Sequence, residues 1–278
     1  MTETLLRGLF DDASLFPPAS LTMVDAVAGH LRHQAAWYGA MSGPFVCPDT
    51  RLGQLSAVLT AAGVPELDLA LVLPGGAADL AMAADAVFAD PRLRLRAIEL
   101  PIGADQAADV VAALDATPLQ GAAAFLEIPA ARMDASTLRV VADHRYLIKI
   151  RTGGVTADAF PDEATLGRCL AELAAARQAF KCTAGLHHAV RHRAEDTGFE
   201  HHGFLNVLLA VRAALDGAGT ADVAATLGVQ DAGRVARAVA ELDRDQAAEI
   251  RGMFTSFGTC STDDPVTDLV TLGLVSED

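Results

Sequence analysis

Side chains that can carry acid–base chemistry are concentrated in one segment, residues 180–206. This segment contains a lysine, five of the eight histidines, two arginines and an asparagine, and it begins with a short apolar run that is typical of a β-strand. α/β enzymes build active sites from polar side chains that follow strands at the carboxyl edge of a sheet. The segment therefore indicates an enzyme and leaves its substrate open.

A second cationic pattern lies in the run 146–151, which reads Y-L-I-K-I-R and continues as T-G-G. Lys149 and Arg151 share one face of the expected strand, because side chains two apart point the same way. Buried cations need partners, and Glu127 on the adjoining strand is the natural one for Lys149. Arg151 is expected to bind a substrate carboxylate or phosphate together with backbone N–H groups. Those groups belong to Thr152, Gly153 and Gly154.

Two glutamates occupy equivalent positions at the ends of consecutive strands. Glu99 lies in R-A-I-E-L-P and Glu127 in A-F-L-E-I-P, each two residues before a proline. A carboxylate at this end of a barrel strand can act as a general base, hold a lysine or bind a metal. We expect both glutamates in the site, with Glu127 as the acid/base.

Lys149 or Lys181 is expected to form an imine with the substrate or to stabilise an enolate, and the local sequence favours Lys181 for the imine. Beside Lys149 in a buried site the pKa of Lys181 is expected to be depressed, which imine formation requires. The sequence K-C-T-A-G at 181–185 resembles the K-T-S-T-G strand end that carries the Schiff-base lysine of deoxyribose-phosphate aldolase and similar class I aldolases. The resemblance implies a barrel enzyme with an imine-forming lysine at position 181. Those aldolases have a second lysine on the following strand, whereas no lysine follows Lys181 here.

The histidines of the segment 180–206 suggest a proton shuttle. His187 lies an even number of residues from Lys181 and so has the same strand parity, and we expect it to move protons in the site. His188 and Asn206 are expected to contact the substrate.

A metal-dependent mechanism is the alternative. Glu99 and Glu127, together with neutral imidazoles, would suit a divalent ion such as zinc or manganese. The imidazoles that could contribute are those of His187, His188, His201 and His202. The two lysines and Arg151 already bring positive charge to the same place, and a dication there would be repelled. We therefore expect no metal cofactor.

The last strand-like run, 253–257, is followed by small and hydroxyl-bearing residues in M-F-T-S-F-G-T-C-S. The last two strand-to-helix loops of barrels commonly bind phosphate through backbone N–H groups. The residues expected to do so are Ser256, Gly258 and Thr259. Cys260 is an alternative nucleophile, provided that a histidine such as His187 activates its thiol.

Strand-like and helix-like stretches alternate along the chain, and this alternation predicts the scaffold. Short apolar or β-branched runs occur at 43–47, 67–73, 94–100, 121–128, 146–151, 180–185 and 253–257. Alanine-rich stretches with helical spacing lie at 52–62, 77–88, 104–114, 136–143 and 162–178. Repeated strand–helix units imply a parallel sheet, and 278 residues suit a TIM-like (β/α)8 barrel.

Helix ends carry residues that suit caps. Gly63 is expected to form a left-handed C-cap, and four aspartates are expected at helix N-termini. These are Asp49, Asp105, Asp134 and Asp162. Residues 204–215 have a periodicity that fits either a strand leading into a helix or a helix throughout. The first case gives a barrel of eight strands and the second a barrel of seven.

A single domain is expected over residues 1–278. Residues 1–42 form an arm and a helix that plug or cap the barrel, and residues 217–251 form inserted helices near the C-terminus. The formal net charge of −15 would repel nucleic acid and anionic membranes.

The compartment and the partner follow from composition. The N-terminal segment lacks the pattern of a secretory signal, and no long uncharged apolar run occurs, so we expect a cytoplasmic protein. The four cysteines contain no C-x-x-C pair and are expected to be free thiols. The expected partner is a small anionic substrate, and a homo-oligomer is left open.

Together these features predict a lyase of aldolase type that acts on a small oxo acid, hydroxy acid or phosphorylated substrate through lysine and glutamate chemistry. A metal-dependent isomerase, lyase or hydrolase is the first alternative. A non-catalytic small-molecule binding protein is the second.

Overall fold

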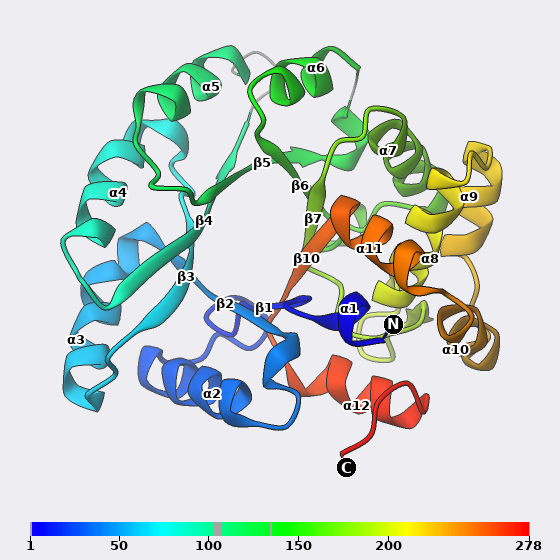
Figure 1. Cartoon of the computed structure of the whole chain (residues 1–278), viewed down its shortest axis with the longest axis horizontal. Coiled ribbons are helices and arrows are strands. Elements are labelled where there is room, and N and C mark those ends of the chain that lie inside the picture. The colour runs from blue at the N-terminus through cyan, green and yellow to red at the C-terminus, as the bar shows by residue number, and fades with distance from the viewer. Residues whose placement is uncertain (1, 103–106, 134, 278) are drawn as a thin grey trace.

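Eight parallel strands close into a barrel in this computed structural model, which describes residues 2–102, 107–133 and 135–277 (Figure 1). Around the barrel the strands follow the order β1-β10-β7-β6-β5-β4-β3-β2. Their bounds are β1 Phe10–Asp12, β2 Ser42–Pro48, β3 Leu67–Val72, β4 Leu93–Pro101, β5 Ala123–Pro129, β6 Leu147–Arg151, β7 Phe180–Thr183 and β10 Phe254–Thr259. The predicted (β/α)8 barrel is confirmed.

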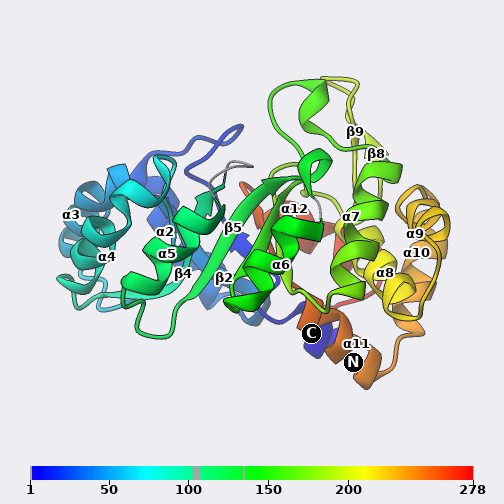
Figure 2. The ribbon, with the colours of Figure 1, turned by 90° about the horizontal axis from the view of Figure 1, so that it is seen from above.

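Helices surround the barrel (Figure 1). They are α1 Thr2–Leu6, α2 Met23–Ala35, α3 Leu52–Ala62, α4 Leu80–Phe88, α5 Ala107–Ala116, α6 Ala135–Asp143, α7 Glu163–Ala175, α8 Phe204–Leu215, α9 Thr220–Leu227, α10 Ala232–Ala240, α11 Arg244–Met253 and α12 Asp263–Thr271. A small antiparallel hairpin, β8 His192–Arg193 with β9 Glu200–His201, follows β7. In Figure 2 this hairpin lies at the top, opposite α1 and α11 at the bottom.

The expected helix caps are present in part. The side chain of Asp162 accepts a hydrogen bond of 2.7 Å from the N–H of Thr165 at the start of α7. Gly63 ends α3 in the left-handed conformation, with a φ of +63°. Asp49 instead begins a 3₁₀ turn, and α3 starts without a side-chain cap. Asp105 and Asp134 lie outside the described residues.

The eighth strand comes from the N-terminal arm, and this corrects the expectation that the arm only plugs or caps the barrel. β1 pairs with both β10 and β2 and closes the cylinder. The segment with ambiguous periodicity, by contrast, is helical throughout as α8. Its Leu205, Val207 and Leu208 are all buried, and a helix that is covered on several sides lacks the one-sided apolar stripe that would identify it.

The residues expected to form an insertion build α9, α10 and α11. α9 packs closely on α7, because a Cβ at Gly167 would lie 3.0 Å from the Cα of Ala224. α11 begins with a capping box between Asp243 and Gln246, and the Arg251 guanidinium donates to the carbonyl of Arg7 at 2.9 Å. α9 thus packs on α7 and α8, α10 packs on α8, and α11 contacts α8, β10 and the N-terminal α1.

Side chains alternate between the helix layer and the barrel interior, as parallel strands require. The outward set, which includes Phe45, Leu69 and Ile98, packs in the main core with the helices. The inward set forms a separate small apolar cluster of Val46, Ala70, Ala97 and Phe125. Polar inward side chains of β4, β5, β6, β7 and β1 adjoin this cluster, and they make up the candidate site.

Candidate active site

Glu99 bridges the two lysines of the chain inside the barrel. Its Oε2 lies 2.8 Å from Lys149 Nζ, and its Oε1 lies 2.5 Å from Lys181 Nζ. No side chain of the three is more than 5% exposed. The sequence contains no other lysine. Both lysine side chains of the protein are therefore buried and contact the same carboxylate.

The contacts continue on both sides of this bridge. Glu127 Oε2 lies 3.0 Å from Lys149 Nζ, and Glu127 Oε1 lies 2.8 Å from an Arg151 Nη atom. On the other side Lys181 Nζ donates to Asp11 Oδ2, which also accepts a hydrogen bond of 2.8 Å from Ser256 Oγ. We call the six charged residues the ionic network; they are Arg151, Glu127, Lys149, Glu99, Lys181 and Asp11. Positive and negative charges alternate along this network, and its three carboxylates balance its three cations.

Strand register explains why these side chains meet. Glu127, Lys149 and Lys181 are direct neighbours across β5, β6 and β7. Each points inward because its sequence neighbours, such as Ile148 and Cys182, are buried among the helices. Arg151 is two residues further along β6 and reaches the rim, where 48% of its side chain is exposed.

Glu99 is ionised by its two neighbours. Burial by itself would raise the pKa of Glu99, but the ammonium groups of Lys149 and Lys181 outweigh burial and lower the pKa to about 2. Glu127 behaves in the same way: burial is outweighed by Lys149 and Arg151, and its pKa is lowered. Both glutamates are therefore anions at neutral pH.

Lys181 does not have the depressed pKa that the sequence suggested. Burial lowers the pKa of Lys181, but the carboxylates of Asp11 and Glu99 outweigh burial, so the pKa lies above its ordinary value. The depressed pKa was expected from the neighbouring Lys149 alone. Asp11, which is 170 residues away in the chain, reverses the direction of the shift together with Glu99. A raised pKa favours the ammonium form of Lys181, which donates hydrogen bonds.

Asp11 was missed because β1 is only three residues long and too short to show alternation. Burial raises the pKa of Asp11, and although Lys181 opposes this rise, Glu99 adds to it. The available signal was the acidic pair Asp11-Asp12 directly after the apolar Leu9-Phe10, the same strand-end pattern that identified Glu99.

The T-G-G segment after β6 packs against the loop that follows β7. The N–H of Thr152 donates to the carbonyl of Thr183 at 2.9 Å, so this N–H is not available to an anion. The hydroxyl of Thr152 donates to the carbonyl of Ala184 at 2.5 Å. A Cβ at Gly153 would lie 2.7 Å from the Cα of Gly185. The glycine lets the two loops touch.

Gly154 is also closely packed, since a Cβ there would lie 2.7 Å from the Cβ of Ala159. Gly154 and Arg151 are both exposed, and a clamp for an anion made by these two residues stays a prediction.

His187 contacts the end of β10 and not the lysines. Its Nδ1 lies 3.1 Å from Thr259 Oγ1 and 3.9 Å from Cys260 Sγ. Burial lowers the pKa of His187 to about 4, so the ring is neutral at physiological pH. Burial also raises the pKa of the Cys260 thiol, which counts against this cysteine as a nucleophile despite the nearby histidine.

The remaining histidines bind other partners. His188 Nδ1 lies 3.1 Å from Asp268 of α12, and His202 Nε2 lies 2.7 Å from the carbonyl of Pro161. The ring of His201 packs on Phe160, with centroids 4.4 Å apart. In the described ranges no three His, Cys, Asp or Glu side chains form a group that could hold a metal ion. The histidines are thus separated from Glu99 and Glu127, with which the metal alternative would combine them.

Asn206 is a structural residue. It is fully buried, its Oδ1 accepts from the N–H of Arg191, and its Nδ2 donates to the carbonyls of Thr226 and Val229. Both of its N–H donors are thereby used within the protein. The side chain ties α8 to α9 and does not face a substrate.

The residues expected to bind phosphate at the end of β10 have other contacts. Ser256 donates to Asp11, and the Thr259 hydroxyl donates to the carbonyl of Ser261 at 2.9 Å. A Cβ at Gly258 would meet Thr183 Oγ1 at 3.7 Å, an ordinary packing distance. The first turn of α12 carries Asp263 and Asp264, whose charges would repel a phosphate at this helix N-terminus. A phosphate site here stays a prediction, and these charges count against it.

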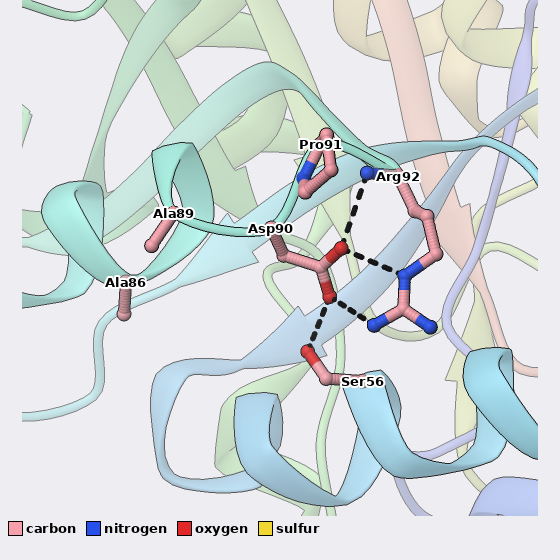
Figure 3. A pocket seen from close by; sticks show the side chains of 6 residues that line it. All are labelled: Ser56, Ala86, Ala89, Asp90, Pro91 and Arg92. Carbon is pink, nitrogen blue, oxygen red and sulfur yellow. Dashed lines mark hydrogen bonds and ion pairs between the residues drawn. The ribbon is translucent and has the colours of Figure 1, made fainter.

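A hollow of about 500 Å³ lies outside the barrel, beside α3 and α4 (Figure 3). It is lined by Ser56, Ala86, Ala89, Asp90, Pro91 and Arg92. The carboxylate of Asp90 accepts from the Arg92 guanidinium at 2.7 and 2.8 Å and from the Ser56 hydroxyl at 2.7 Å. Its charged groups neutralise each other, so the hollow offers little for catalysis.

The fold and the network define the class of this molecule as a (β/α)8 barrel with a buried ionic network, and this fold is commonly that of enzymes. No protein-family model and no curated protein sequence matches the chain. Among the described helices, none is both long enough and apolar enough to cross a membrane.

Proposed function

We propose that this protein is a lyase of aldolase type that cleaves or forms a carbon–carbon bond next to a carbonyl group of a small anionic substrate. The single observation that supports this most is the bridging of Lys149 and Lys181 by Glu99. Two ammonium groups at one place in a low-dielectric interior would stabilise negative charge that develops on a substrate oxygen.

Cleavage next to a carbonyl produces such a charge as an enolate. An acid/base must also remove and return a proton, and a carboxylate of the ionic network can serve, Glu127 being the one that the sequence favours. Arg151 at the rim would hold the anionic end of the substrate. The raised pKa of Lys181 favours an ammonium that stabilises an enolate over an amine that forms an imine.

The test is cleavage of a panel of small 2-oxo-4-hydroxy acids and phosphorylated hydroxy ketones, followed by detection of the carbonyl products. Each reaction is repeated with borohydride. We expect turnover without a borohydride-stable adduct on Lys181. Mass spectrometry that finds such an adduct would replace the enolate mechanism by an imine mechanism, and an inactive panel would favour the metal-dependent or binding-protein alternative.

The variant Arg151→Met tests whether Arg151 binds the anionic end of the substrate. The loss of a charge-assisted pair of about 1.5–3 kcal/mol should raise KM by about one to two orders of magnitude and change kcat little. Arg92→Met at the exterior hollow is the control and should leave KM unchanged. An unchanged KM in Arg151→Met would place this residue outside the substrate site.

A further inference from the structure

We propose that Asp11, rather than Glu127, is the catalytic acid/base of this site, and that its Oδ1 is the atom that receives the substrate's proton. The inference rests on the proposed function and assigns one of its central roles to a residue that the sequence motifs did not indicate.

Occupancy of the carboxylate oxygens distinguishes the three acids. Glu99 has an ammonium on each oxygen. Glu127 has Lys149 on Oε2 and Arg151 on Oε1. Within the described part of the chain, Asp11 receives both Lys181 and Ser256 on Oδ2. Among the described residues no cation contacts Oδ1 of Asp11, whereas each carboxylate oxygen of Glu99 and Glu127 contacts one.

Gly43 lets this oxygen lie directly against the backbone of β2. A Cβ at position 43 of β2 would lie only 2.3 Å from Asp11 Oδ1, so every other residue type would collide with it. Glycine in a strand often marks such a close approach, and a side chain at position 43 would displace Asp11 Oδ1 from its place.

Electrostatics agree with this geometry. The pKa of Asp11 is raised by burial, whereas the cations lower the pKa of Glu99 and of Glu127. A carboxylate with a raised pKa is the stronger base, and in its protonated form it can return the proton at a pH closer to neutral.

Asp11 is also held rigidly. Its neighbour Asp12 accepts from the N–H of Ser14 at 3.0 Å and pairs with the buried His30 of α2, Oδ2 to Nδ1, at 3.0 Å. Gln34 contacts the other ring nitrogen of His30 at 2.9 Å. A base that is fixed in this way does not have to be ordered when the substrate binds.

The step conserves atoms and electrons. Asp11 Oδ1 takes the proton of the substrate's hydroxyl group, and the O–H electron pair becomes the second bond of the new carbonyl. The bond between the α and β carbons breaks, and its electron pair forms an enolate whose oxygen accepts a hydrogen bond from Lys181. Asp11 then returns its proton to the enolate carbon, and no further reactant is consumed.

The experiment compares Asp11→Asn with Glu127→Gln on the substrate that the panel identifies. We expect Asp11→Asn to lower kcat by at least about 100-fold with KM within a few-fold, and to abolish one limb of the pH profile of kcat. Glu127→Gln should mainly raise KM and keep that limb. Retention of the limb in Asp11→Asn, or its loss in Glu127→Gln alone, overturns the assignment.

Gly43→Ala is a second variant that keeps the carboxylate and obstructs Oδ1. It should lower kcat, whereas the control Gly53→Ala, where a Cβ meets nothing within 4 Å, should not. Equal kcat values in the two variants contradict a role for Oδ1.

A titration followed by NMR separates failure of this inference from failure of the proposed function, because it needs no substrate. Aspartate is labelled with ¹³C at the carboxyl carbon, and the Asp11 signal is assigned by its loss in Asp11→Asn. A titration midpoint above the ordinary value of 3.8 supports Asp11 as the proton-holding residue even if the panel is inactive. A midpoint below 3.8 refutes the inference even if the protein is an active lyase.

Discussion

At the scale of single residues, Glu99 holds the interior of the barrel together. Two ammonium groups in a dry interior would repel each other strongly, and Glu99 binds both at 2.5 and 2.8 Å. A buried charge that loses its partner is costly, whereas an intact pair contributes only a small net stability. The effect of removing Glu99 therefore measures how strongly the lysines depend on it.

We predict that Glu99→Gln destabilises the protein by about 3–5 kcal/mol at pH 7. Because the pKa of Glu99 is lowered from 4.5 to about 2, its ionisation stabilises the folded state above pH 4.5, by about 3 kcal/mol. This stabilisation is lost as the pH falls from about 4.5 to about 2. Urea unfolding at pH 7, 4.5 and 3 checks both statements.

The variant should have a flatter acid dependence than the wild type. Glu3→Gln is the control, since the side chain of Glu3 is 77% exposed and exposed pairs contribute under about 1 kcal/mol. An unfolding free energy of Glu99→Gln within about 1 kcal/mol of the wild type at pH 7 would contradict the prediction.

At the scale of elements, β1 is the least regular part of the barrel and depends on side chains for its position. It has three residues, and its pairing with β2 shifts register between Phe10 and Asp12. The contact of Asp12 with His30 connects the end of β1 to α2. The ring of His30 also packs on the ring of Phe45, with centroids 5.3 Å apart. α2 thereby positions Asp11 from outside the barrel.

We predict that His30→Phe, which keeps the ring but removes both nitrogens, lowers the free energy of unfolding by about 1–3 kcal/mol, because Asp12 is left buried without its partner. His144→Phe is the control, since His144 pairs with Asp115 at the surface, and its cost should stay below about 1 kcal/mol. Urea denaturation measures both. Equal effects in the two variants would show that the Asp12–His30 contact does not hold β1.

At the scale of the whole molecule, the first strand joins the last and closes the cylinder. β1 lies between β10 and β2, and the rings of Phe10, Phe257 and Phe204 pack together behind it with centroids 5.2–5.8 Å apart. Without β1, two strand edges with unpaired N–H and C=O groups would be exposed, and such edges promote association between chains.

Deletion of residues 2–12 should abolish cooperative thermal unfolding and cause self-association in light scattering. Deletion of residues 276–278, which follow α12, is the control and should preserve the wild-type transition. A monomeric shortened chain with a cooperative transition would mean that the barrel closes without β1.

The sequence by itself determined the strand–helix alternation, seven of the eight strands and the shared face of Lys149, Lys181, Glu99 and Glu127. These properties are local: a strand's period of two fixes which side chains point inward, and capping residues such as Asp162 and Gly63 mark helix ends through their own conformations. The carboxyl edge of a parallel barrel then places strand-end side chains together.

Only the tertiary structure decided which groups face the lysines and what protonation they adopt. Asp11 reaches Lys181 through barrel closure between residues 170 apart, and no local pattern reports closure. The pKa of Lys181 is set by the sum of burial and two carboxylates from distant strands, so the neighbouring lysine alone suggested the wrong direction. The histidines face α12, Phe160 and Pro161 because loop packing beyond the strands, which has no fixed period, determines their orientation.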